Sequence, residues 1–424
     1  MHTWIIIGGG IQGMTLATFL RKQKGITPEE MAIIDPHKEP LSEWKRCTEA
    51  ISMPFLRSPF VHHLDVDPFS LNNHAKDSPF SEDASFLGRF KRPSLLLFHE
   101  HCEHLMRKQN IRDSWIQGRV ESVNRLDTGW KVQLTSGREV SGINIVLAIG
   151  AGEQLHWPEW AQQLRTESPG SVFHVFDREL PEFDASQAPF TIIGGGITAV
   201  HLTLKLHKLF PGQVTLLKRH PFRVHDFDSD PGWLGPKCQQ AFHKTRSYTR
   251  RREMIVHARR KGSIPRDLNA KLRKQLRQFP KLVADGHVHR AVWQRGITSL
   301  VDEQGGLIHQ TGTVILATGF QPQLPGREWL SPVIEEQRLK CAECGYPVVT
   351  HTLQWGPGLY VMGPLAELEV GPIARNISGA REAASRILQA QSKKSPVKRR
   401  PATPAGAVTE RRKGATRAED PASE

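Results

Sequence analysis

The chain has 424 residues, which is enough for two domains that each bury a core of their own. Its residues are 38% hydrophobic and 7% aromatic. No apolar run approaches the roughly 20 residues that cross a bilayer, so we expect a soluble, cytoplasmic protein without a transmembrane segment. Five scattered cysteines exclude a disulfide framework.

The net charge of +14 is concentrated in two stretches. Residues 243–277 hold thirteen Lys or Arg and two acidic residues, and residues 391–424 hold nine Lys or Arg and four acidic residues. We expect 391–424 to be a disordered basic tail, because its composition cannot bury a core. The rest of the chain is close to neutral.

A glycine-rich turn between a strand and a helix opens the chain. Trp4–Ile7 is a short apolar run typical of a buried parallel strand, and a helix is expected over Met14–Lys22. Between them lie the glycines of a G-x-G-x-x-G turn, Gly8, Gly10 and Gly13. The first glycine permits the tight turn, the second lets a pyrophosphate approach the backbone, and the third lets the helix pack on the strand. The turn therefore predicts a dinucleotide site at the helix N-terminus.

An acidic residue follows the second predicted strand. Met31–Ile34 is apolar and ends at Asp35, about 20 residues beyond the last glycine of the turn, where a ribose 2′-hydroxyl ligand is expected. The alternative is a solvated turn residue before Pro36. The surrounding pattern of strand, glycines and helix favours the ribose ligand.

The next stretch, residues 36–93, shows no clear periodicity. A long irregular segment is more often functional than accidental, so we expect it to line a substrate pocket. A helix is predicted from about Pro93 to Lys108, with Pro93 in its first turn. Its histidines, His99, His101 and His104, could ligate a metal. No cysteine or carboxylate cluster surrounds them, so a partly exposed polar face is favoured and no metal is predicted.

Short alternating strands follow the helix. Trp115–Val123, Trp130–Leu134 and Val140–Ser141 are typical of a three-stranded antiparallel meander. Ile143–Leu147 is then expected to return to the parallel sheet, and residues 153–188 to form a connector.

The first pattern is then repeated nearly 190 residues later. Phe190–Ile193 is a predicted strand, and a helix is expected to end at Leu209. The turn between them is the G-x-G-x-x-A variant, with Gly194, Gly196 and Ala199.

The second strand of this unit, Gln213–Leu217, ends in Lys218 and Arg219 rather than in an acid. Basic side chains at this point suit a 2′-phosphate. The second nucleotide is therefore predicted to be NADPH.

The fold class expected is α/β, with two Rossmann-like doubly wound dinucleotide-binding units and a small antiparallel β-meander. The expected domains are 1–155 and 156–322, the latter with a basic helical insert at 240–280, followed by a return segment at 323–390 and the tail. Within the second unit, Thr313–Leu316 is a strand that leads into Thr318 and Gly319. Leu359–Met362 is a final strand, and Gly371 opens a helix that runs to Leu388.

These motifs resemble the two-dinucleotide-binding-domain flavoproteins, and among them the class B flavin monooxygenases that include the lysine and ornithine N-hydroxylases. The resemblance covers about residues 1–390. Its order matches theirs: two glycine turns, Leu-Ala-Ile-Gly at 147–150, and Leu-Ala-Thr-Gly-Phe-Gln-Pro at 316–322. A linker motif of that family is present in part, as Gly170 and His174. Ordinary roles as turn and strand residues are an equal alternative for these two.

The resemblance implies FAD on the first unit and NADPH on the second. The usual Gly-Asp near the C-terminus is Gly363-Pro364 here, so backbone N–H groups near Ile373 and Ala374 are expected to hold the flavin. Candidate groups near the flavin ring are Arg57, His63 and Asn376; a structural ion pair is an equal alternative for Arg57. The implied cofactor ligands are Gly8, Gly10, Gly13, Asp35, Gly194, Gly196, Ala199, Lys218, Arg219, Thr318, Gly319, Gly363, Ile373 and Ala374.

The function implied is an FAD- and NADPH-dependent monooxygenase that uses molecular oxygen to hydroxylate a nucleophilic nitrogen or sulfur of a small molecule. One alternative is an FAD-dependent NAD(P)H dehydrogenase or reductase that does not activate oxygen. The other is a non-enzymatic flavin sensor or nucleic-acid-associated protein that uses the basic insert. Nucleic-acid binding is disfavoured, because few aromatic residues accompany the basic ones.

The cysteines decide against a disulfide reductase. No cysteine pair follows either glycine turn at the spacing that such chemistry needs. Cys341 and Cys344 form a C-x-x-C, which could be redox-active or bind zinc. Zinc needs two further ligands that the sequence does not offer nearby, so a turn before Tyr346 is the favoured interpretation.

Overall fold

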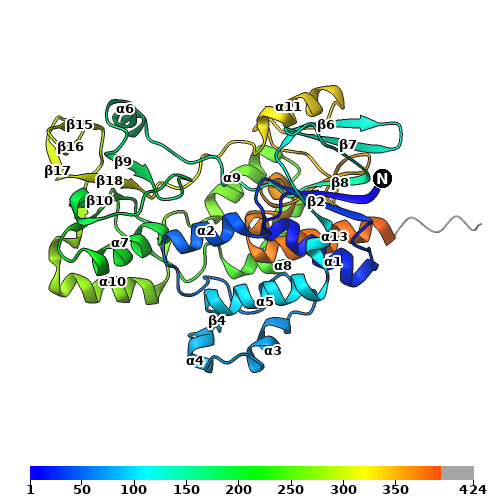
Figure 1. Cartoon of the computed structure of the whole chain (residues 1–424), viewed down its shortest axis with the longest axis horizontal. Helices are drawn as coiled ribbons and strands as arrows, with labels where there is room; N and C mark the ends of the chain where they lie inside the picture. Colours follow the sequence, from blue (N-terminus) through cyan, green and yellow to red (C-terminus); the bar gives the residue numbers. More distant parts are fainter. Residues whose placement is uncertain (393–424) are drawn as a thin grey trace, which may run out of the picture.

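The computed structural model describes residues 1–392 and contains two lobes joined side by side (Figure 1). The first lobe holds the N-terminus, and its sheet has the strand order β19-β20-β8-β1-β2-β5. The second lobe holds a sheet of order β14-β11-β10-β18-β9. Both sheets carry helices, so the predicted α/β class with two Rossmann-like units is confirmed. The basic tail predicted at 391–424 lies almost wholly outside the described residues.

The first lobe is built on the predicted opening unit. Strand β1 pairs in parallel with β2 on one side and with β8 on the other, so that Ile5 lies beside Ala32 and Ile145. Helix α1 follows β1 directly. The bounds are β1 His2–Ile7, α1 Ile11–Lys24, β2 Met31–Asp35, β5 Trp115–Gln117, β8 Glu139–Leu147, β19 Gln354–Gly356 and β20 Leu359–Val361.

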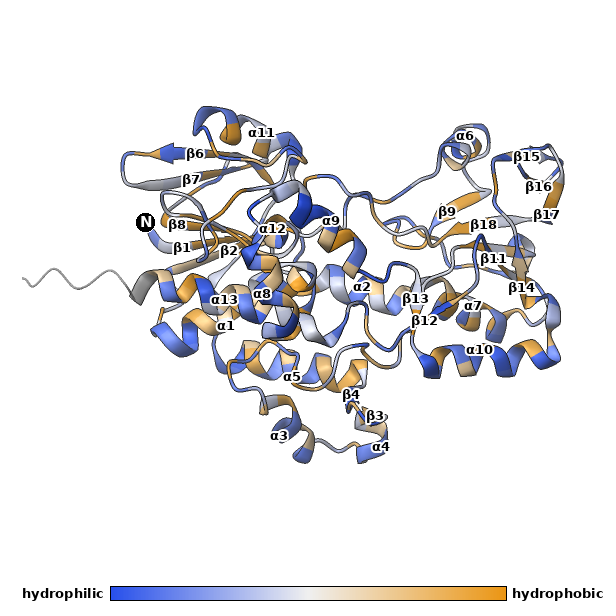
Figure 2. Ribbon diagram, turned by 180° about the vertical axis from the view of Figure 1, so that it is seen from behind, coloured by the Kyte–Doolittle hydropathy of each residue, from blue (hydrophilic) through white to orange (hydrophobic). Residues whose placement is uncertain are grey.

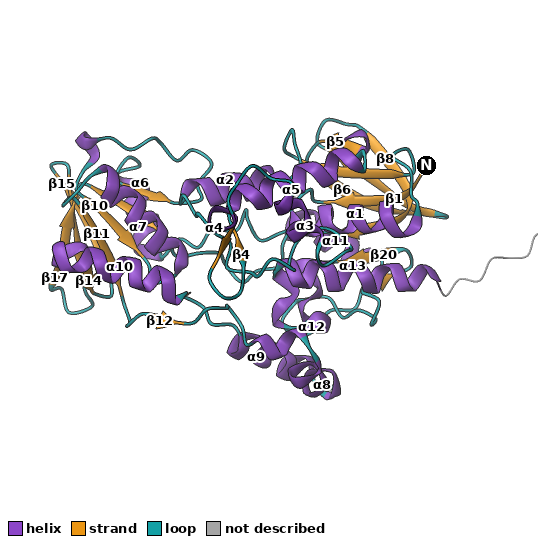
Figure 3. Ribbon diagram, turned by 90° about the horizontal axis from the view of Figure 1, so that it is seen from below, coloured by secondary structure: helices purple, strands orange, loops and turns teal. Residues whose placement is uncertain are grey.

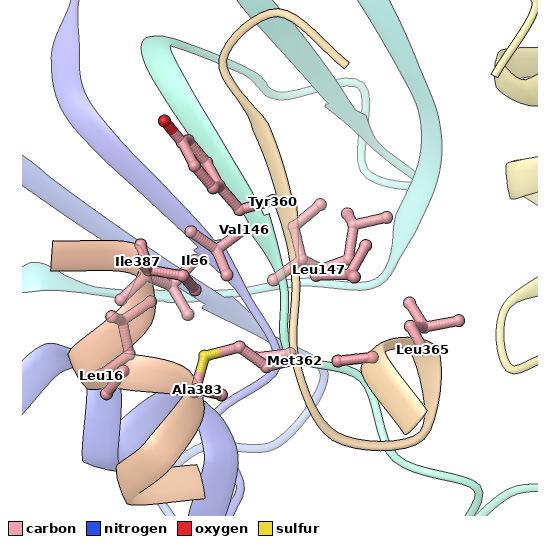
Figure 4. Close-up of a cluster of buried hydrophobic side chains, with 14 of the residues drawn as sticks. Ile6, Leu16, Val146, Leu147, Tyr360, Met362, Leu365, Ala383 and Ile387 are labelled. Carbon is pink, nitrogen blue, oxygen red and sulfur yellow. The ribbon is translucent and has the colours of Figure 1, made fainter. Parts of the chain in front are cut away.

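The core of this lobe lies between the sheet and the last helix, α13 (Ile377–Ser392). In Figure 4, Leu16 of α1 lies beside Ala383 and Ile387 of α13, against Ile6 on the sheet. These side chains are almost completely buried. The last helix of the chain therefore seals the first nucleotide unit, which explains why the chain must return to this lobe.

Two details of the antiparallel meander differ from the prediction. The expected strand Trp115–Val123 is two strands, because Gly118 and Arg119 interrupt it; β5 joins the parallel sheet and β6 (Val120–Leu126) pairs with β7 (Gly129–Leu134). The two pieces expected at 140–141 and 143–147 are one strand, β8, whose first half pairs with β7 and whose second half pairs with β1.

The stretch 36–93, expected to be irregular, contains regular elements. Their bounds are α2 Ser42–Ala50, α3 Ser70–Lys76, α4 Glu82–Ser85, β3 Phe86–Leu87 and β4 Arg92–Pro93. The following helix, α5, spans Leu95–Lys108, and Ser94 caps it by accepting a hydrogen bond from the N–H of Leu97. The sequence predicted Pro93 in the first turn of the helix, but it lies in strand β4. The helix begins after Ser94, because the serine caps its N-terminus.

The second lobe repeats the parallel arrangement. The three predicted strands are present, with β10 between β11 and β18, and Ile192 lies beside Leu216 and Ile315. The predicted connector 153–188 contributes a helix and an edge strand to this lobe. The bounds are α6 Glu159–Glu167, β9 Val172–His174, β10 Phe190–Ile193, α7 Ile197–Leu209, β11 Val214–Lys218, β14 Val283–Asp285 and β18 Thr313–Leu316. A meander, β15 Arg290–Gln294, β16 Ile297–Val301 and β17 Leu307–Thr311, precedes β18.

The two chain crossings between the lobes run side by side. The N–H of His156 donates to the Gly319 carbonyl at 2.8 Å, and the N–H of Gln321 donates to the Gln154 carbonyl at 2.7 Å. Phe320 of the second crossing stacks on Phe176 with ring centroids 5.6 Å apart. The paired crossings fix where one lobe meets the other.

The stretch between β11 and β14 is shared by both lobes. Helices η3 Pro231–Leu234, α8 Pro236–Lys244 and α9 Tyr248–Ala258 pack on the first lobe, where Phe242 and Ile255 join its core. Figure 3 shows α8 and α9 grouped with α12 (Glu367–Val370). Helix α10 (Arg266–Gln278) instead covers the second lobe. The short strands β12 (Arg223–Val224) and β13 (Ser263–Ile264) pair on the side of the second lobe that faces the first (Figure 2).

Many of the basic residues in this stretch are paired with acids. Arg251 bonds Glu369 at 2.8 Å, and Arg252 forms an ion pair with Glu367. The basic stretch is therefore divided between the lobes and partly neutralised, and it does not form one exposed surface. Figure 2 shows the hydrophobic colour concentrated on the sheets and inner helix faces of both lobes. Among the described residues, no helix is both long and apolar enough to span a membrane.

The return segment differs from the prediction at its end. It begins with helix α11 (Arg327–Glu336) and reaches β20, η5 (Gly363–Ala366), α12 and η6 (Pro372–Arg375) before α13. The single helix predicted from Gly371 to Leu388 is therefore two helices, broken at Asn376, whose backbone is extended. This break places Asn376 at the N-terminal end of α13.

Candidate functional site

The first glycine turn forms an open cradle at the N-terminus of α1. A Cβ atom added at Gly13 would lie 1.9 Å from the Gly8 carbonyl oxygen, and Gly8 itself has φ of +110°. Both glycines are thus required by the fold. Gly10 differs, because nothing lies within 4 Å of the point where its Cβ would stand. The helix has no side-chain cap at this end, so its first N–H groups remain available for an anion.

Asp35 lies at the end of β2, next to this cradle. Its Oδ2 accepts a hydrogen bond of 2.7 Å from the N–H of Gly9, and its Oδ1 accepts one of 3.0 Å from the N–H of His37. The carboxylate is thereby fixed at the rim of the cradle. The His37 ring nitrogen Nδ1 also contacts Oδ1 at 2.8 Å, so Oδ2, with one donor, is the oxygen that can also accept from a ribose hydroxyl.

The far side of the cradle is formed by the return segment. The Nε2 atom of buried Gln12 donates to the carbonyl oxygens of Ala374 and Asn376 at 3.1 and 3.3 Å. Its Oε1 atom is buried without a hydrogen-bond partner among the described residues. Gly363 has φ of +61°, and a Cβ atom added to it would lie 3.1 Å from Cγ of Gln12. An unpaired buried acceptor is costly, and it marks a place where a ligand donor fits.

The backbone groups expected to hold the flavin are only partly free. The N–H of Ala374 donates to the Gly371 carbonyl at 3.0 Å within η6, and the carbonyl of Ala374 accepts from Gln12. Ile373 is buried beside it. The structure therefore brings these residues to the cradle, with the Ala374 N–H already engaged.

Asn376 joins the two lobes at this point. Its side-chain amide donates to Oδ1 of Asp228 at 3.3 Å, and Asp228 lies in the loop after β12. Asp228 was not among the predicted site residues, because nothing in the local sequence distinguishes it from other acids of a polar loop.

Arg57 also bridges the lobes. Its guanidinium donates to the carbonyls of His225 and Asp226 at 2.6 and 3.0 Å and to Oγ of Ser263 at 2.9 Å. Loss of hydration lowers the pKa of Arg57, since these partners are neutral and the nearby Asp228 only partly compensates. The structure places this side chain as a clamp on the β12–β13 unit, bound to carbonyl oxygens and not to an acidic side chain.

His63 forms its hydrogen bonds within its own loop and not with the cradle. It is fully buried, its Nδ1 accepts from the N–H of Asp65 at 3.1 Å, and its Nε2 contacts the Pro68 carbonyl at 3.1 Å. Burial lowers the pKa of His63 to about 4. Its ring packs edge-on against His101 at 5.0 Å. With both nitrogens engaged, His63 is held by its own loop.

The helix α5 histidines form the predicted partly exposed face at His99, which is half-buried, and at His104, which is exposed, but not at His101. His101 is fully buried, and burial lowers its pKa to about 2. Oγ of Ser70 contacts its Nε2 at 2.8 Å. Within the residues that the structure describes, no group of three or more His, Cys, Asp or Glu side chains is arranged to hold a metal ion.

The second glycine turn is built like the first but is covered. Gly194 has φ of +156°, and its added Cβ would lie 2.8 Å from the Ala317 carbonyl and 3.1 Å from Cβ of Ala199. At Gly196, the counterpart of Gly10, the added Cβ would lie 3.2 Å from Cα of Gly262. The loop before β13 thus lies on the second cradle.

The two basic residues at the end of β11, Lys218 and Arg219, differ in their surroundings. Lys218 is nearly buried and forms an ion pair with Asp285 at the end of β14. Arg219 is exposed, and its guanidinium has no hydrogen bond or ion pair among the described residues. His220 follows, with Cε1 3.3 Å from the added Cβ of Gly195. Arg219 is therefore the free cation at this strand end.

Thr318 and Gly319 lie in the crossing between the lobes. The Thr318 hydroxyl donates to the His156 carbonyl, and Gly319 adopts φ of +81°. His174, at the end of β9, is fully buried close to Gly319. Burial lowers the pKa of His174 to about 4, although the Gly319 backbone opposes the shift. The linker histidine and the Ala-Thr-Gly motif therefore meet at the hinge.

The cysteines are all free thiols, and each falls among the described residues. Cys47 lies on α2, where burial raises its pKa to about 12. Cys341 and Cys344 lie in a tight turn closed by the N–H of Ala342 donating to the Tyr346 carbonyl at 2.9 Å, as predicted. Oxidation chemistry at a dithiol beside the first cradle is therefore not supported by these positions.

The whole described architecture is that of a two-dinucleotide flavoprotein. The sequence profile of the pyridine nucleotide-disulphide oxidoreductases matches residues 2–386. The chain belongs to that family. This membership, with two glycine cradles of the required form, confirms the predicted class of an oxidoreductase that uses FAD and NAD(P)H.

Comparison with solved structures gives the same fold. The FAD-bound cadaverine monooxygenase DfoA from Erwinia amylovora is 16% identical with a TM-score of 0.71, over 96% of this chain and 100% of that chain. The ornithine N-hydroxylase of Kutzneria sp. 744, solved with reduced FAD, NADP+ and L-ornithine, is 16% identical with a TM-score of 0.73, over 93% and 100%. The ornithine hydroxylase PvdA from Pseudomonas aeruginosa is 19% identical with a TM-score of 0.69, over 92% and 99%. No curated protein matches by sequence.

The residues present fit FAD on the first lobe. Gly10 leaves space for a pyrophosphate, Asp35 is fixed at the rim, and Gln12 carries a buried acceptor without a donor. Gln12 and Asp228 were both missed from the sequence. Gln12 lies inside the glycine motif, where its helical position could have drawn attention, whereas Asp228 carries no such signal.

Proposed function

We propose that this protein is an FAD- and NADPH-dependent monooxygenase that hydroxylates a nucleophilic nitrogen of a small molecule. The observation that carries the proposal is the similarity to amine N-hydroxylases over more than nine-tenths of the chain, including the return of the last helix to the first cradle. Sulfur oxygenation is the second candidate for the same site.

When bound, FAD and NADPH would supply the redox chemistry, which is hydride transfer from NADPH and activation of molecular oxygen. The chain binds and orients them. Gly8, Gly10 and Gly13 with the N-terminus of α1 hold the pyrophosphate of FAD, and Asp35 accepts from its ribose. Gly363, Ile373 and Ala374 line the opposite side of the cradle, and Gln12 offers its unpaired oxygen there.

The second lobe holds NADPH by the same physics. Gly194, Gly196 and Ala199 shape the turn at the N-terminus of α7, and Arg219 meets the 2′-phosphate, with Lys218 supporting it through the ion pair to Asp285. Thr318 and Gly319 shape the crossing that brings the two cradles together. Asn376 and Arg57 bind the loop around Asp228 between the lobes, where they would limit water access to the site.

A dehydrogenase that does not activate oxygen is the main alternative, since it would use the same two cradles. The test is aerobic NADPH oxidation by purified, FAD-loaded protein with a panel of diamines, amino acids and thioethers. The proposal expects consumption of NADPH to yield hydroxylated amine in an amount close to the NADPH consumed. Hydrogen peroxide as the sole product for every compound would contradict it.

A further inference from the structure

The loop that covers the second cradle carries uncompensated positive charge. It follows α9 and contains Arg259, Arg260, Lys261 and Gly262. Arg260 lies near Asp230, with an N–O distance of 3.8 Å. Neither the Arg259 guanidinium nor the Lys261 ammonium forms a hydrogen bond or ion pair with any described side chain or carbonyl. Both groups therefore have unused donors.

This loop contacts the second nucleotide cradle and is linked to the first through Asp228. Gly262 lies on the second cradle, 3.2 Å from the added Cβ of Gly196. The N–H of Arg260 donates to the Asp228 carbonyl at 2.7 Å, and Asp228 in turn accepts from Asn376 at the end of the first cradle. The backbone of the loop therefore lies between the second cradle and the Asp228–Asn376 contact at the end of the first.

Cations outnumber anions around the loop. Arg259 faces Arg375, and the acids near it are Asp228 and Glu367. Glu367 is already shared by Arg375, at 2.8 Å, and Arg252. Burial alone would raise the pKa of Glu367, but these two guanidinium groups outweigh it and hold the pKa below its usual range. Glu367 is thus already paired with Arg252 and Arg375 and does not pair with Arg259.

The charged state of the loop is correspondingly unfavourable. The pKa of half-buried Arg259 is lowered mainly by loss of hydration and, to a smaller extent, by the neighbouring charge of Arg375. The pKa of Lys261, at the solvent edge, is lowered mainly by partial loss of hydration and, to a smaller extent, by the charge of Arg259. A cluster of like charges with free donors is the arrangement expected of a site that receives an anion.

We propose that Arg259 and Lys261, beside Arg375, bind an oxyanion of a ligand lying between the two cradles, either a phosphate of NADPH or the carboxylate of an acidic amine substrate. The geometry that supports this is the position of their loop between Gly196 and Asn376, together with their unused donors. Binding of a substrate carboxylate rests on the proposed function, whereas binding of a coenzyme phosphate requires only that the protein binds NADPH.

The first test measures equilibrium binding to FAD-loaded protein without turnover. Calorimetric titrations with NADP+, lysine and cadaverine are compared for the wild type, the R259A/K261A double variant and the R250A control. Arg250 is an exposed arginine on helix α9, which precedes the loop, and its ion pair with Glu253, at 2.6 Å, is local. Lysine and cadaverine differ only in the carboxylate.

The double variant is expected to lose roughly tenfold or more in affinity for one anionic ligand, and R250A to lose none. Weaker NADP+ binding assigns the site to a coenzyme phosphate. Weaker lysine binding with cadaverine unchanged assigns it to a substrate carboxylate. Wild-type affinity of the double variant for both NADP+ and lysine overturns the proposal. Failure of the monooxygenase function would appear instead as absence of hydroxylated product, with these affinities unaffected.

A second readout separates a binding role from a structural one. If Arg259 is held charged for a ligand, R259A in the absence of anions should be at least as resistant to thermal unfolding as the wild type, because like-charge repulsion is removed. Inorganic pyrophosphate should then stabilise the FAD-loaded wild type more than the variant. A lower unfolding temperature of ligand-free R259A, or equal stabilisation of both proteins by pyrophosphate, contradicts the assignment.

Discussion

The side-chain amide of Asn376 donates a 3.3 Å hydrogen bond to Asp228, and so joins the start of the last helix to a loop of the other lobe. The partners are 148 residues apart in sequence. The bond lies beside the Gln12 contact to the Asn376 carbonyl, at 3.3 Å, so a single residue contacts both the first cradle and the loop that faces the second.

Replacing Asn376 with Ala should uncouple the loop from the cradle while leaving the cradle intact. The backbone carbonyl that Gln12 uses is unchanged, so FAD content per chain should match the wild type. We expect hydroxylated product to fall about tenfold and the share of peroxide to rise, since water reaches the site more readily. The measurement is product and peroxide per NADPH consumed. Asn73→Ala, in exposed helix α3, is the control, and an unchanged product yield in Asn376→Ala would contradict this role.

Two glycines of the first turn should respond oppositely to alanine. Gly13→Ala places a Cβ 1.9 Å from a backbone oxygen, which cannot move aside, so we expect a loss of stability of about 3 kcal/mol or more. Gly10→Ala meets empty space and should change stability by less than about 0.5 kcal/mol. It should nevertheless weaken FAD binding, because the added methyl group takes the place of the pyrophosphate. Unfolding midpoints and flavin content measure both; normal flavin content in Gly10→Ala would show that the cradle binds no pyrophosphate.

Lys218 and Arg219, at the end of β11, should contribute unequally to coenzyme selection. Arg219→Ala removes the free cation and is expected to weaken NADPH binding roughly tenfold with little effect on NADH. Lys218→Ala should have a smaller effect, because the ammonium already pairs with Asp285. Dissociation constants for both coenzymes give the comparison. Equal binding of NADPH and NADH by the wild type would remove the assignment of both residues.

Acid should destabilise the fold through its buried neutral histidines. The pKa of His63 falls from 6.5 to about 4 on burial, so the unfolded chain binds a proton more readily than the folded one. Stability contributed by neutral His63 is therefore present above about pH 6.5 and declines as the pH falls toward 4, by about 3 kcal/mol at most. Urea unfolding of wild type and His63→Gln between pH 7 and 4 tests this. A smaller loss is expected in the variant, whereas exposed His257→Gln should retain the wild-type loss; identical slopes in all three would contradict the argument.

The parallel strands and both glycine turns could be predicted from sequence because their causes are local. A run such as Trp4–Ile7 followed by spaced glycines specifies strand, turn and helix within about twenty residues. The break at Asn376 could not be predicted, since it depends on packing of η6 against Gln12. The pairing of Lys218 with Asp285 was equally hidden, because Asp285 joins the same sheet only after the long excursion through α8–α10.

The division of the basic stretch between lobes also depends on distant residues. Arg251 and Arg252 belong to the same helix turn, yet their partners Glu369 and Glu367 lie in the return segment more than one hundred residues later. Sequence alone could show the charge and its location, but not which cations would be neutralised. Among the described residues, Arg259 and Lys261 have no acceptor, and the nearby Glu367 is already paired with Arg252 and Arg375.

The most direct test of the central claim is the fate of oxygen during turnover. FAD-loaded protein with NADPH and the best amine of the panel is incubated under ¹⁸O₂, and the product is analysed by mass spectrometry. We expect a hydroxylated amine that carries one ¹⁸O atom, formed only when NADPH and oxygen are both supplied. Unmodified amine, with all of the ¹⁸O recovered in hydrogen peroxide, would contradict it and leave an oxidoreductase that reduces oxygen without inserting it.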